Sequence, residues 1–448
     1  MRRWMGILAG IALVLGLLPA PVGAQTAGAL VASGLANPRG LAIAPDGTIY
    51  VAESGTGGPE QFNAGPPFGT GTRGTTAQIT RIAPDGSKRA LVVGLPSVTL
   101  GPEVIGAKSL FLSGNTLLYT TGYTLGTDTP AIYGPFVGRV DLAASRATNV
   151  ADIGAYERAN NPDGFTVESD AYGVAQAPDG TIWVADAGGN DVFRIDTSGR
   201  LSLVGVLPGI PGGPPNPARK GAAERDAVPT GIAVGRDGTV YVSLLTGAPF
   251  TAGTAKVVKV GPGGTFVDFA TGLNPTVDAR IGPDGNLYVV EFSAGFDLSA
   301  NPPNFIANSG RVLRITPSGQ IAVVAAGLNF PGGVAFDAQG RMYVTVDTDN
   351  PPQAGALGRI LRFDTLTPQP FTPTAPPVPA GPAPGAAPPP TPTAAPVAAA
   401  PPAQQLPGTV VPAQVPTSLP NTGGVPVELP LALGAGAVVA GLVLRRRR

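Results

Sequence analysis

The fold of this chain is decided by one stretch, residues 172–209, which reads YGVAQAPDGTIWVADAGGNDVFRIDTSGRLSLVGVLPG. It contains four short apolar runs, at 172–177, 181–185, 191–195 and 201–206. Pro-Asp-Gly separates the first two runs and Thr-Ser-Gly the last two. Both form tight turns, because Pro presets one backbone dihedral and Gly accepts a positive φ. The stretch therefore predicts a four-stranded antiparallel meander.

The same signature, an apolar run, a turn and a second run containing an aromatic residue, occurs six times. The copies recur at intervals of roughly fifty to seventy residues, and four-stranded units at such a period are typical of a β-propeller rather than a helical solenoid. The sequence thus predicts an all-β fold, a six-bladed β-propeller of four-stranded antiparallel blades over residues 25–366. The six aromatic residues are Tyr50, Tyr119, Trp183, Tyr241, Tyr288 and Tyr343.

The two ends of this domain complete each other. The sixth copy, residues 332–363, has no fourth strand, because the chain turns into proline soon after Phe363. Residues 29–35, ALVASGL, look like a fourth strand without the first three. We expect strand 29–35 to join the blade 332–363 and close the ring, which removes the sheet edges.

The regions outside the propeller have other signatures. Residues 1–24 have a basic start, a short apolar core and a small-residue cleavage site, and predict a secretory signal peptide. Residues 367–418 are rich in Pro and Ala and carry no charge, which predicts a disordered stalk. Residues 419–448 contain LPNTG, an apolar segment (425–444) and four arginines.

The last of these regions resembles the LPXTG cell-wall sorting signal of Gram-positive-type surface proteins. In that family a sortase cleaves between Thr and Gly and joins the Thr carboxylate to the wall. The resemblance implies a sortase as processing partner, anchorage to peptidoglycan and an extracellular, cell-surface location. The alternative is a plain C-terminal membrane anchor whose arginines stay cytoplasmic. The motif residues are Leu419, Pro420, Asn421, Thr422 and Gly423.

Composition narrows the function classes. The chain has no Cys and no His, so an exported domain must be held together by packing alone, and the commonest general base is missing. Lys plus Arg and Asp plus Glu both number 29, and removing residues 1–24 and everything after Thr422 leaves 23 basic and 28 acidic residues. Without a basic run in the domain, nucleic acid is not an expected partner.

The predicted connections are of two kinds. Those from first to second and from third to fourth strands are tight Asp-Gly or Ser-Gly turns at one end of the sheets. Those at the other end, which we call the long-loop face, are long, and long loops on a rigid scaffold are where binding normally occurs. We therefore expect function there. The long connections are 54–78, 122–135, 153–170, 208–228, 245–254 and 292–309.

Acidic residues recur at the ends of the second strands, as Glu53, Asp186 and Glu291. One interpretation is structural: they cap backbone groups or pair with the basic residues of the third strands. The other is a carboxylate cluster in the channel that binds Ca²⁺. The basic residues of the third strands are Arg81, Arg139, Arg194, Lys259, Arg314 and Arg362.

A second set of candidates enters the first strands, which line the axis of a propeller. Together with the second-strand acids and Asn190 they could form a polar ligand-binding pocket near the long-loop face. The alternative is a water-filled channel with no ligand. The entering residues are Arg39, Glu103, Asp170, Tyr172, Thr230 and Asp278.

Three segments, 34–58, 157–174 and 185–196, resemble the ScyD/ScyE family, which is named for genes beside scytonemin biosynthesis. The recurring YVA(D/E) pattern is also similar to NHL repeats. The resemblance covers residues 28–366 and implies a six-bladed propeller and export. It brings no established reaction and no catalytic residues.

Two functions follow from these features. The first is a surface-displayed, wall- or membrane-anchored propeller that binds an extracellular ligand or protein through its long-loop face, which the lack of His favours. The second is an extracellular calcium-dependent hydrolase or lyase of the lactonase-like propeller type, since carboxylates alone can hold Ca²⁺ and activate water.

Overall fold

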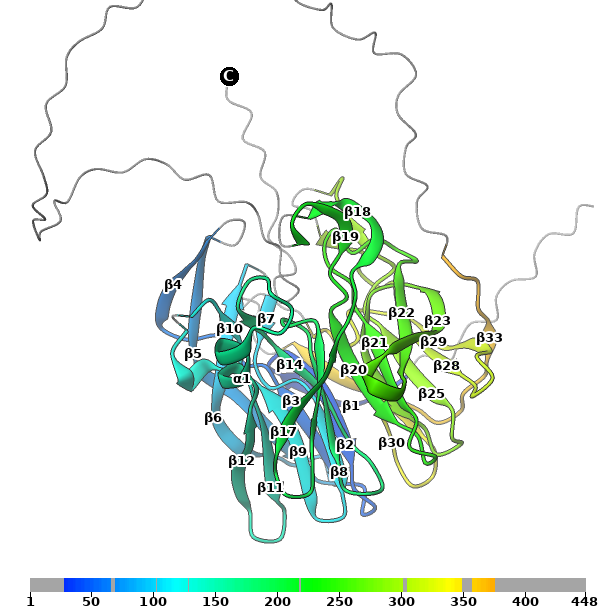
Figure 1. Cartoon of the computed structure of the whole chain (residues 1–448). Coiled ribbons are helices and arrows are strands. Elements are labelled where there is room, and N and C mark those ends of the chain that lie inside the picture. Colours follow the sequence, from blue (N-terminus) through cyan, green and yellow to red (C-terminus); the bar gives the residue numbers. More distant parts are fainter. Residues whose placement is uncertain are drawn as a thin grey trace, which may run out of the picture.

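The computed structural model describes residues 28–65, 69–101, 103–127, 129–216, 219–300, 304–348 and 357–374. Over these residues the protein is nearly all-β, with six antiparallel sheets of four or more strands standing side by side. The tight turns lie at the bottom of Figure 1 and the longer connections at the top. The predicted signal peptide 1–24, most of the stalk 367–418 and the sorting segment 419–448 lie outside the described residues.

The stretch from which the fold was predicted forms one complete sheet, in the order in which its strands occur in the chain. Trp183 pairs with Ala175 on one side and Arg194 on the other, as a meander requires. The strands are β14 (Ala171–Gln176), β15 (Ile182–Asp186), β16 (Asp191–Ile195) and β17 (Leu201–Val206).

Two sheets precede this one in the chain. The first is enlarged, because its third strand continues upward and pairs with an added strand. It contains β2 (Pro38–Ile43), β3 (Ile49–Glu53), β4 (Glu60–Gly65), β5 (Gly69–Ile82), β6 (Lys88–Leu100) and β7 (Glu103–Ile105). The second contains β8 (Leu110–Ser113), β9 (Thr116–Thr121), β11 (Phe136–Asp141) and β12 (Arg146–Asp152).

Two sheets follow it. One contains β20 (Pro229–Val234), β21 (Val240–Leu244), β22 (Ala255–Val260) and β23 (Phe266–Leu273). The other contains β24 (Thr276–Ile281), β25 (Leu287–Glu291), β28 (Gly310–Ile315), β29 (Ile321–Leu328) and the short β33 (Gln369–Pro370).

The remaining sheet joins the two ends of the described chain. Its order is β1-β32-β31-β30, and Leu30 pairs with Leu361 while Leu35 pairs with Gly358. The N-terminal strand thus occupies the fourth position that the sixth repeat lacks. The strands are β1 (Ala29–Leu35), β30 (Gly333–Phe336), β31 (Met342–Val346) and β32 (Gly358–Phe363).

Several connections of the long-loop face are themselves folded, and the helix at 153–160 agrees with a short helical turn expected at the start of residues 151–170. Segment 54–78, expected to be a glycine-rich loop, contains β4 and the start of β5. Segment 208–228 contains a hairpin that rises above the sheets in Figure 1. The added elements are β10 (Thr124–Leu125), η1 (Ala131–Tyr133), α1 (Ile153–Asn160), β13 (Glu168–Ser169), β18 (Ile210–Asn216), β19 (Ala222–Arg225), β26 (Phe296–Asp297) and β27 (Asn304–Phe305); a short η3 (Pro262–Gly264) lies in the turn before β23.

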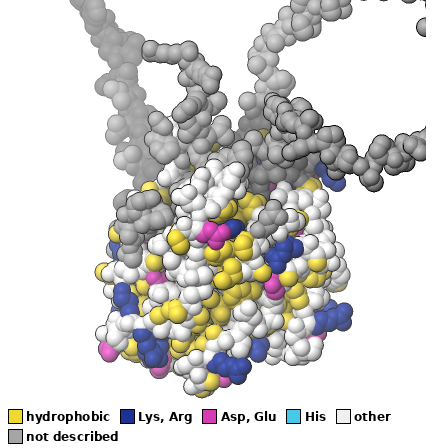
Figure 2. Space-filling model, turned by 90° about the vertical axis from the view of Figure 1, so that its left-hand side faces the viewer, with side chains coloured by type: hydrophobic (Ala, Val, Ile, Leu, Met, Phe, Trp, Pro, Cys, Tyr) yellow, Lys and Arg dark blue, Asp and Glu magenta, His cyan; other side chains and the backbone are white. Residues whose placement is uncertain are grey.

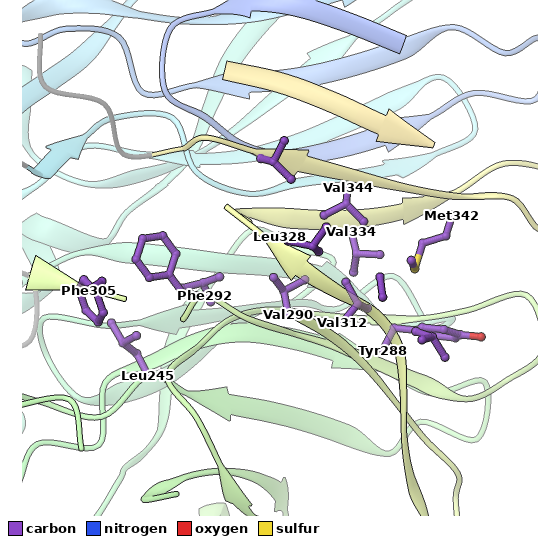
Figure 3. Packing of buried hydrophobic residues seen from close by; sticks show 14 of the residues in the cluster. Leu245, Tyr288, Val290, Phe292, Phe305, Val312, Leu328, Val334, Met342 and Val344 are labelled. Carbon is purple, nitrogen blue, oxygen red and sulfur yellow. The ribbon is translucent and has the colours of Figure 1, made fainter. Parts of the chain in front are cut away.

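The hydrophobic core lies between the sheets rather than inside a single layer. In Figure 3, Val290 and Val312 of one sheet lie next to Val334, Met342 and Val344 of the following sheet, and all five side chains are fully or almost fully buried. Neighbouring sheets cover both faces of these sheets. Successive residues of one strand, which point to opposite faces, can therefore all be apolar. This is the packing expected when sheets of one kind cover one another.

The first strands of the sheets contact one another in the order β2, β8, β14, β20, β24, β30 and back to β2. Glycine allows this close approach: a Cβ on Gly231 of β20 would lie 2.4 Å from the nitrogen of Ala279 in β24. Real Cβ atoms do not come so near to a backbone atom, so any larger residue would push the two strands apart.

The chain beyond Phe363 does not leave the sheets at once. Gln369 and Pro370 pair with Val323 and Ala322 of β29, although this segment was expected to be stalk. Proline is tolerated there because β33 is an edge strand, where a missing N–H costs no ladder hydrogen bond. The ring of Phe371 then lies 5.1 Å from the guanidinium of Arg311.

No helix within the described residues has the length and apolar character needed to cross a membrane. The apolar segment 425–444 lies outside these residues. On the face shown in Figure 2, basic side chains are separated from one another by apolar and neutral surface and do not merge into one patch.

Candidate functional site

The second-strand acids cap the backbone of their own sheets. Each accepts a hydrogen bond from the N–H of a residue just before the first strand: Ala36 N to Glu53 Oε2 is 2.6 Å, and Asn274 N to Glu291 Oε1 is 2.9 Å. Asp186 Oδ1 accepts in the same way from Asp170 N at 2.5 Å. The repeat of these acids therefore has a structural cause, since each fixes the entry of the chain into a sheet.

The side-chain partners of these acids differ from those expected. Glu291 pairs with Arg311 and Asp347 with Arg359, both at the beginning of a third strand. The predicted partner Arg314 instead lies opposite Tyr288 in the strand register, and Arg362 pairs with Asp364 at the tight-turn end. The expectation that Arg314 and Arg362 pair with the second-strand acids is therefore wrong. These two arginines lie near the end of their strands, whereas the acids lie beside the beginning.

Two of the predicted first-strand residues form part of a buried group of charges. The carboxylate of Asp170 pairs with the ammonium of Lys108, and their side chains are only 3% and 2% exposed. Lys108 also donates a 2.8 Å hydrogen bond to the carbonyl of Gly122, and Arg39 donates one of 3.1 Å to the carbonyl of Val104. Burial raises the pKa of Asp170, whereas the nearby Lys108 and Arg39 lower it.

Lys108 was missed at the sequence level. It lies two residues before the start of β8, one residue before Ser109, and Arg39 lies one residue before Gly40 in β2. Gly40 N donates a 2.6 Å hydrogen bond to the carbonyl of Lys108, so the two basic residues come from adjacent first strands. Aligning the repeats on their first strands could have found it.

A second charged group ties together four of the first strands. The guanidinium of Arg280 in β24 donates hydrogen bonds to Ser109 Oγ (3.0 Å) and to the carbonyl of Val174 in β14 (3.3 Å). Its Nε lies 3.5 Å from the carboxylate of Asp278, which also accepts a 3.0 Å bond from the N–H of Val334 in β30. Polar side chains therefore connect the first strands across the space between them.

The remaining candidates lie at different places. Thr230 donates a 2.8 Å hydrogen bond to the carbonyl of Thr276, which joins β20 to β24. The side chain of Tyr172 belongs to the apolar core, and Glu103 begins β7. Asn190 Oδ1 accepts a 3.1 Å hydrogen bond from Val228 N. Ligand binding by the ten candidate residues remains a prediction.

A group of buried acids beside α1 was also missed. Glu157 of α1 and Asp191 of β16 are 0% exposed, and their carboxylate oxygens have no hydrogen-bond partner among the described residues. Burial raises the pKa of Glu157 to about 8 and that of Asp191 well above its usual range, with further increases from Asp186 and Asp163. Burial also raises the pKa of Asp186 to about 6.

A metal could explain such acids, but the geometry does not provide a site. Among the described residues, no group of three or more Asp, Glu, His or Cys side chains is arranged to hold a metal ion. In the absence of a cation, burial favours the neutral form of the Glu157 and Asp191 carboxyl groups.

The long-loop face carries exposed apolar side chains. Within the described residues, four of the seven exposed large hydrophobic residues lie in connections between second and third strands: Ile132, Leu298, Ile306 and Leu357. The same face carries an ordered aromatic contact, in which the guanidinium of Arg73 lies 5.1 Å from the ring of Phe62 and 5.2 Å from that of Tyr133. The long-loop face therefore combines exposed apolar side chains with ordered aromatic contacts.

No protein-family model matches this chain, and no curated protein matches its sequence. Solved structures are similar in fold. A gluconolactonase from Xanthomonas campestris is 14% identical, with a TM-score of 0.44 and coverage of 74% of this chain and 88% of its own. The PQQ-bound aldose sugar dehydrogenase of Streptomyces coelicolor is 14% identical, with a TM-score of 0.44 and coverage of 74% and 95%.

A virginiamycin B lyase from Staphylococcus aureus is 16% identical, with a TM-score of 0.40 and coverage of 74% of this chain and 97% of its own. At this level of identity and TM-score, the likeness carries no argument about activity.

Proposed function

We propose that the six sheets are the blades of a six-bladed β-propeller, closed by pairing of the N-terminal strand with the last blade. The pairing of β1 with β32 and the cyclic order of contacts between first strands support this. Closure leaves no sheet edge in the ring itself and presents the connections as two opposite faces.

We further propose that this propeller binds an extracellular partner with apolar groups through its long-loop face. The observation that carries the proposal is the concentration there of Ile132, Leu298, Ile306 and Leu357, which are 44–64% exposed. Apolar residues on ordered loops at one end of a rigid scaffold are typical of an interaction surface. The other three exposed hydrophobics among the described residues, Leu30, Val93 and Val267, lie on the fourth strands of three different sheets.

Photocrosslinking of the full chain on its host cell tests the face. A photoreactive amino acid at position 306 should give adducts of defined mass, whereas the same amino acid at position 93 should not. Replacing segment 292–309 by a short turn should abolish adducts formed from position 132 while the melting temperature of the propeller changes little. Equal adducts at 93 and 306, or none at either, would contradict the assignment.

We propose that residues 1–24 direct export and that residues 419–448 attach the chain to the cell wall through a sortase. The order of LPNTG, apolar segment and arginines supports this. Thr422→Ala should move the protein from the wall fraction to the membrane fraction or the medium. An unchanged wall fraction, or a wall fraction that a sortase-deficient host retains, would contradict sortase attachment.

The second candidate is a calcium-dependent hydrolase or lyase. It would depend on the buried acids Glu157, Asp186 and Asp191, whose carboxylates would have to lose their protons and move into a shared ligand set to hold Ca²⁺. Melting curves with Ca²⁺ and with a chelator, together with elemental analysis, decide it. A rise in melting temperature that Asp191→Asn removes would support a calcium site; bound calcium with no such rise, or no calcium, would exclude this role.

A further inference from the structure

A cavity lies at the end of the sheets opposite to the long-loop face. Its volume is about 400 Å³, and it is lined by the last residues of β2, β8, β20, β24 and β30 and by the tight turns that follow them. Residues of five first strands therefore line one cavity, and the tight turns of these sheets lie at the bottom of Figure 1. A cavity of this size is within the range of about 300–1,000 Å³ that small-molecule sites occupy.

A neighbouring cavity of about 350 Å³ continues toward the end of β14. Phe111, Val234 and Arg236 line both cavities, so the two are adjacent and Arg236 borders each of them. We call the combined depression the turn-face pocket. It is large enough to hold a ligand with two parts, one at the axis and one beside Gln176.

The walls of the turn-face pocket are mixed, with polar backbone and two arginines beside apolar side chains. The half-buried side chains of Ile43, Leu112, Ile281 and Phe336 contribute hydrocarbon surface. The side chain of Arg280 is 12% exposed and is held by Ser109, Val174 and Asp278, so its position is fixed.

Arg236 is exposed, and it has no hydrogen bond or ion pair with the described residues. The acidic residue lining the pocket, Asp337, is already neutralised: its carboxylate pairs with Arg341 at 2.6 Å and accepts a 3.1 Å hydrogen bond from Tyr343. The pocket therefore carries a net positive charge. The guanidinium of Arg236, at its rim, is free to bind an anion.

We propose that the turn-face pocket binds a small organic carboxylate with an apolar body. A guanidinium matches a planar carboxylate with two parallel hydrogen bonds, and the apolar walls contact hydrocarbon that an inorganic anion lacks. Arg236 binds the carboxylate, and the body of the ligand lies against Leu112 and Phe336. This site is separate from the long-loop face and does not depend on the function proposed for it.

Calorimetry with 1-naphthylacetate as the probe tests the site, with the neutral 1-naphthylacetamide as matched ligand and inorganic phosphate as competitor. Naphthylacetate should bind the purified full chain at least about tenfold more tightly than the amide, because only the carboxylate can form a charge-assisted hydrogen bond with Arg236. Excess phosphate at constant ionic strength should not displace it. Arg236→Gln should weaken naphthylacetate about tenfold and leave the amide unchanged.

The control variant is Arg194→Gln, whose guanidinium is exposed on β16 and bonds to Ser202 at 3.2 Å. It should bind both ligands like the wild type. Equal affinity for acid and amide, displacement by phosphate, or equal effects of the two arginine substitutions would each overturn the proposal. Unchanged melting temperatures of both variants show that binding, not folding, is measured.

Discussion

The hydroxyl of Thr345 donates a 2.6 Å hydrogen bond to the backbone carbonyl of Arg39, although 306 positions separate the two residues. Thr345 is 0% exposed and belongs to β31, whereas Arg39 belongs to β2. The bond joins the last sheet of the chain to the first. It is therefore one of the contacts on which a closed ring depends.

Thr345→Val should test this contact with almost no change of shape. It leaves a buried carbonyl without that donor, which costs about 1–3 kcal/mol of unfolding free energy. Thr345→Ser keeps the hydroxyl and should cost less. Denaturant unfolding measures both; a valine variant as stable as the serine variant would show that the bond contributes nothing.

The pairing of β1 with the last sheet predicts different effects for two leucines of the same strand. Leu35 is 1% exposed and Leu30 is 61% exposed. Leu35→Ala should cost about 2–5 kcal/mol of unfolding free energy, because it leaves a cavity in the core. Leu30→Ala should change it by less than about 0.5 kcal/mol. Equal effects in denaturant unfolding would contradict the burial of β1 against β32.

The ion pair of Lys108 and Asp170 predicts that substitutions of these two residues have strongly non-additive effects on the free energy of unfolding. Lys108→Met should cost about 3–5 kcal/mol, because it leaves the carboxylate of Asp170 buried without its partner. The double substitution Lys108→Met with Asp170→Leu should recover much of this loss. The exposed pair of Lys256 and Asp268 is the control, and Lys256→Met should cost less than about 1 kcal/mol. Additive costs in the double variant would refute the coupling.

Glu157 predicts that the free energy of unfolding falls as the pH rises from about 4.5 to about 8. Its pKa is raised to about 8 in the folded protein and has a value of 4.5 in the absence of burial, so the folded state holds a proton that the unfolded state releases. The free energy of unfolding should therefore fall by about 1.4 kcal/mol per pH unit between about pH 4.5 and pH 8 from this group alone. Asp191, whose pKa is raised in the same direction, adds to the fall.

Glu157→Gln should remove its part of this slope. The variant should gain stability relative to the wild type as pH rises from 5 to 8, measured by denaturant unfolding at each pH. Asp186 and Asp163, which also raise the pKa of Glu157, remain in the variant and contribute to the pH dependence that is left. Glu224→Gln, at a half-buried position in β19, is the control and should leave the wild-type slope unchanged. Parallel curves for Glu157→Gln and the wild type would refute the assignment.

Much of the strand pattern could be predicted from the sequence, because each unit is local. Alternating apolar runs and Asp-Gly turns set β14 to β17 through contacts between neighbouring residues, and the missing fourth strand of the last unit indicated β1. The folding of segment 54–78 into a hairpin could not be predicted, since glycine and polar residues carry no periodicity there. The partner of Glu291 was misassigned for a related reason, because strand register decides whether Arg311 or Arg314 is near it.

By itself, the sequence determined that six similar β-units follow one another and that tight turns alternate with longer connections. Those properties depend on backbone preferences and on the period of apolar residues, which are local. Only the tertiary structure decided that Lys108 meets Asp170, that Arg280 reaches Ser109 and Val174, and that Glu157 and Asp191 are buried without hydrogen-bond partners. These contacts join residues from separate repeats or from an inserted helix, and their energies depend on distance and burial, which the order of residues does not contain.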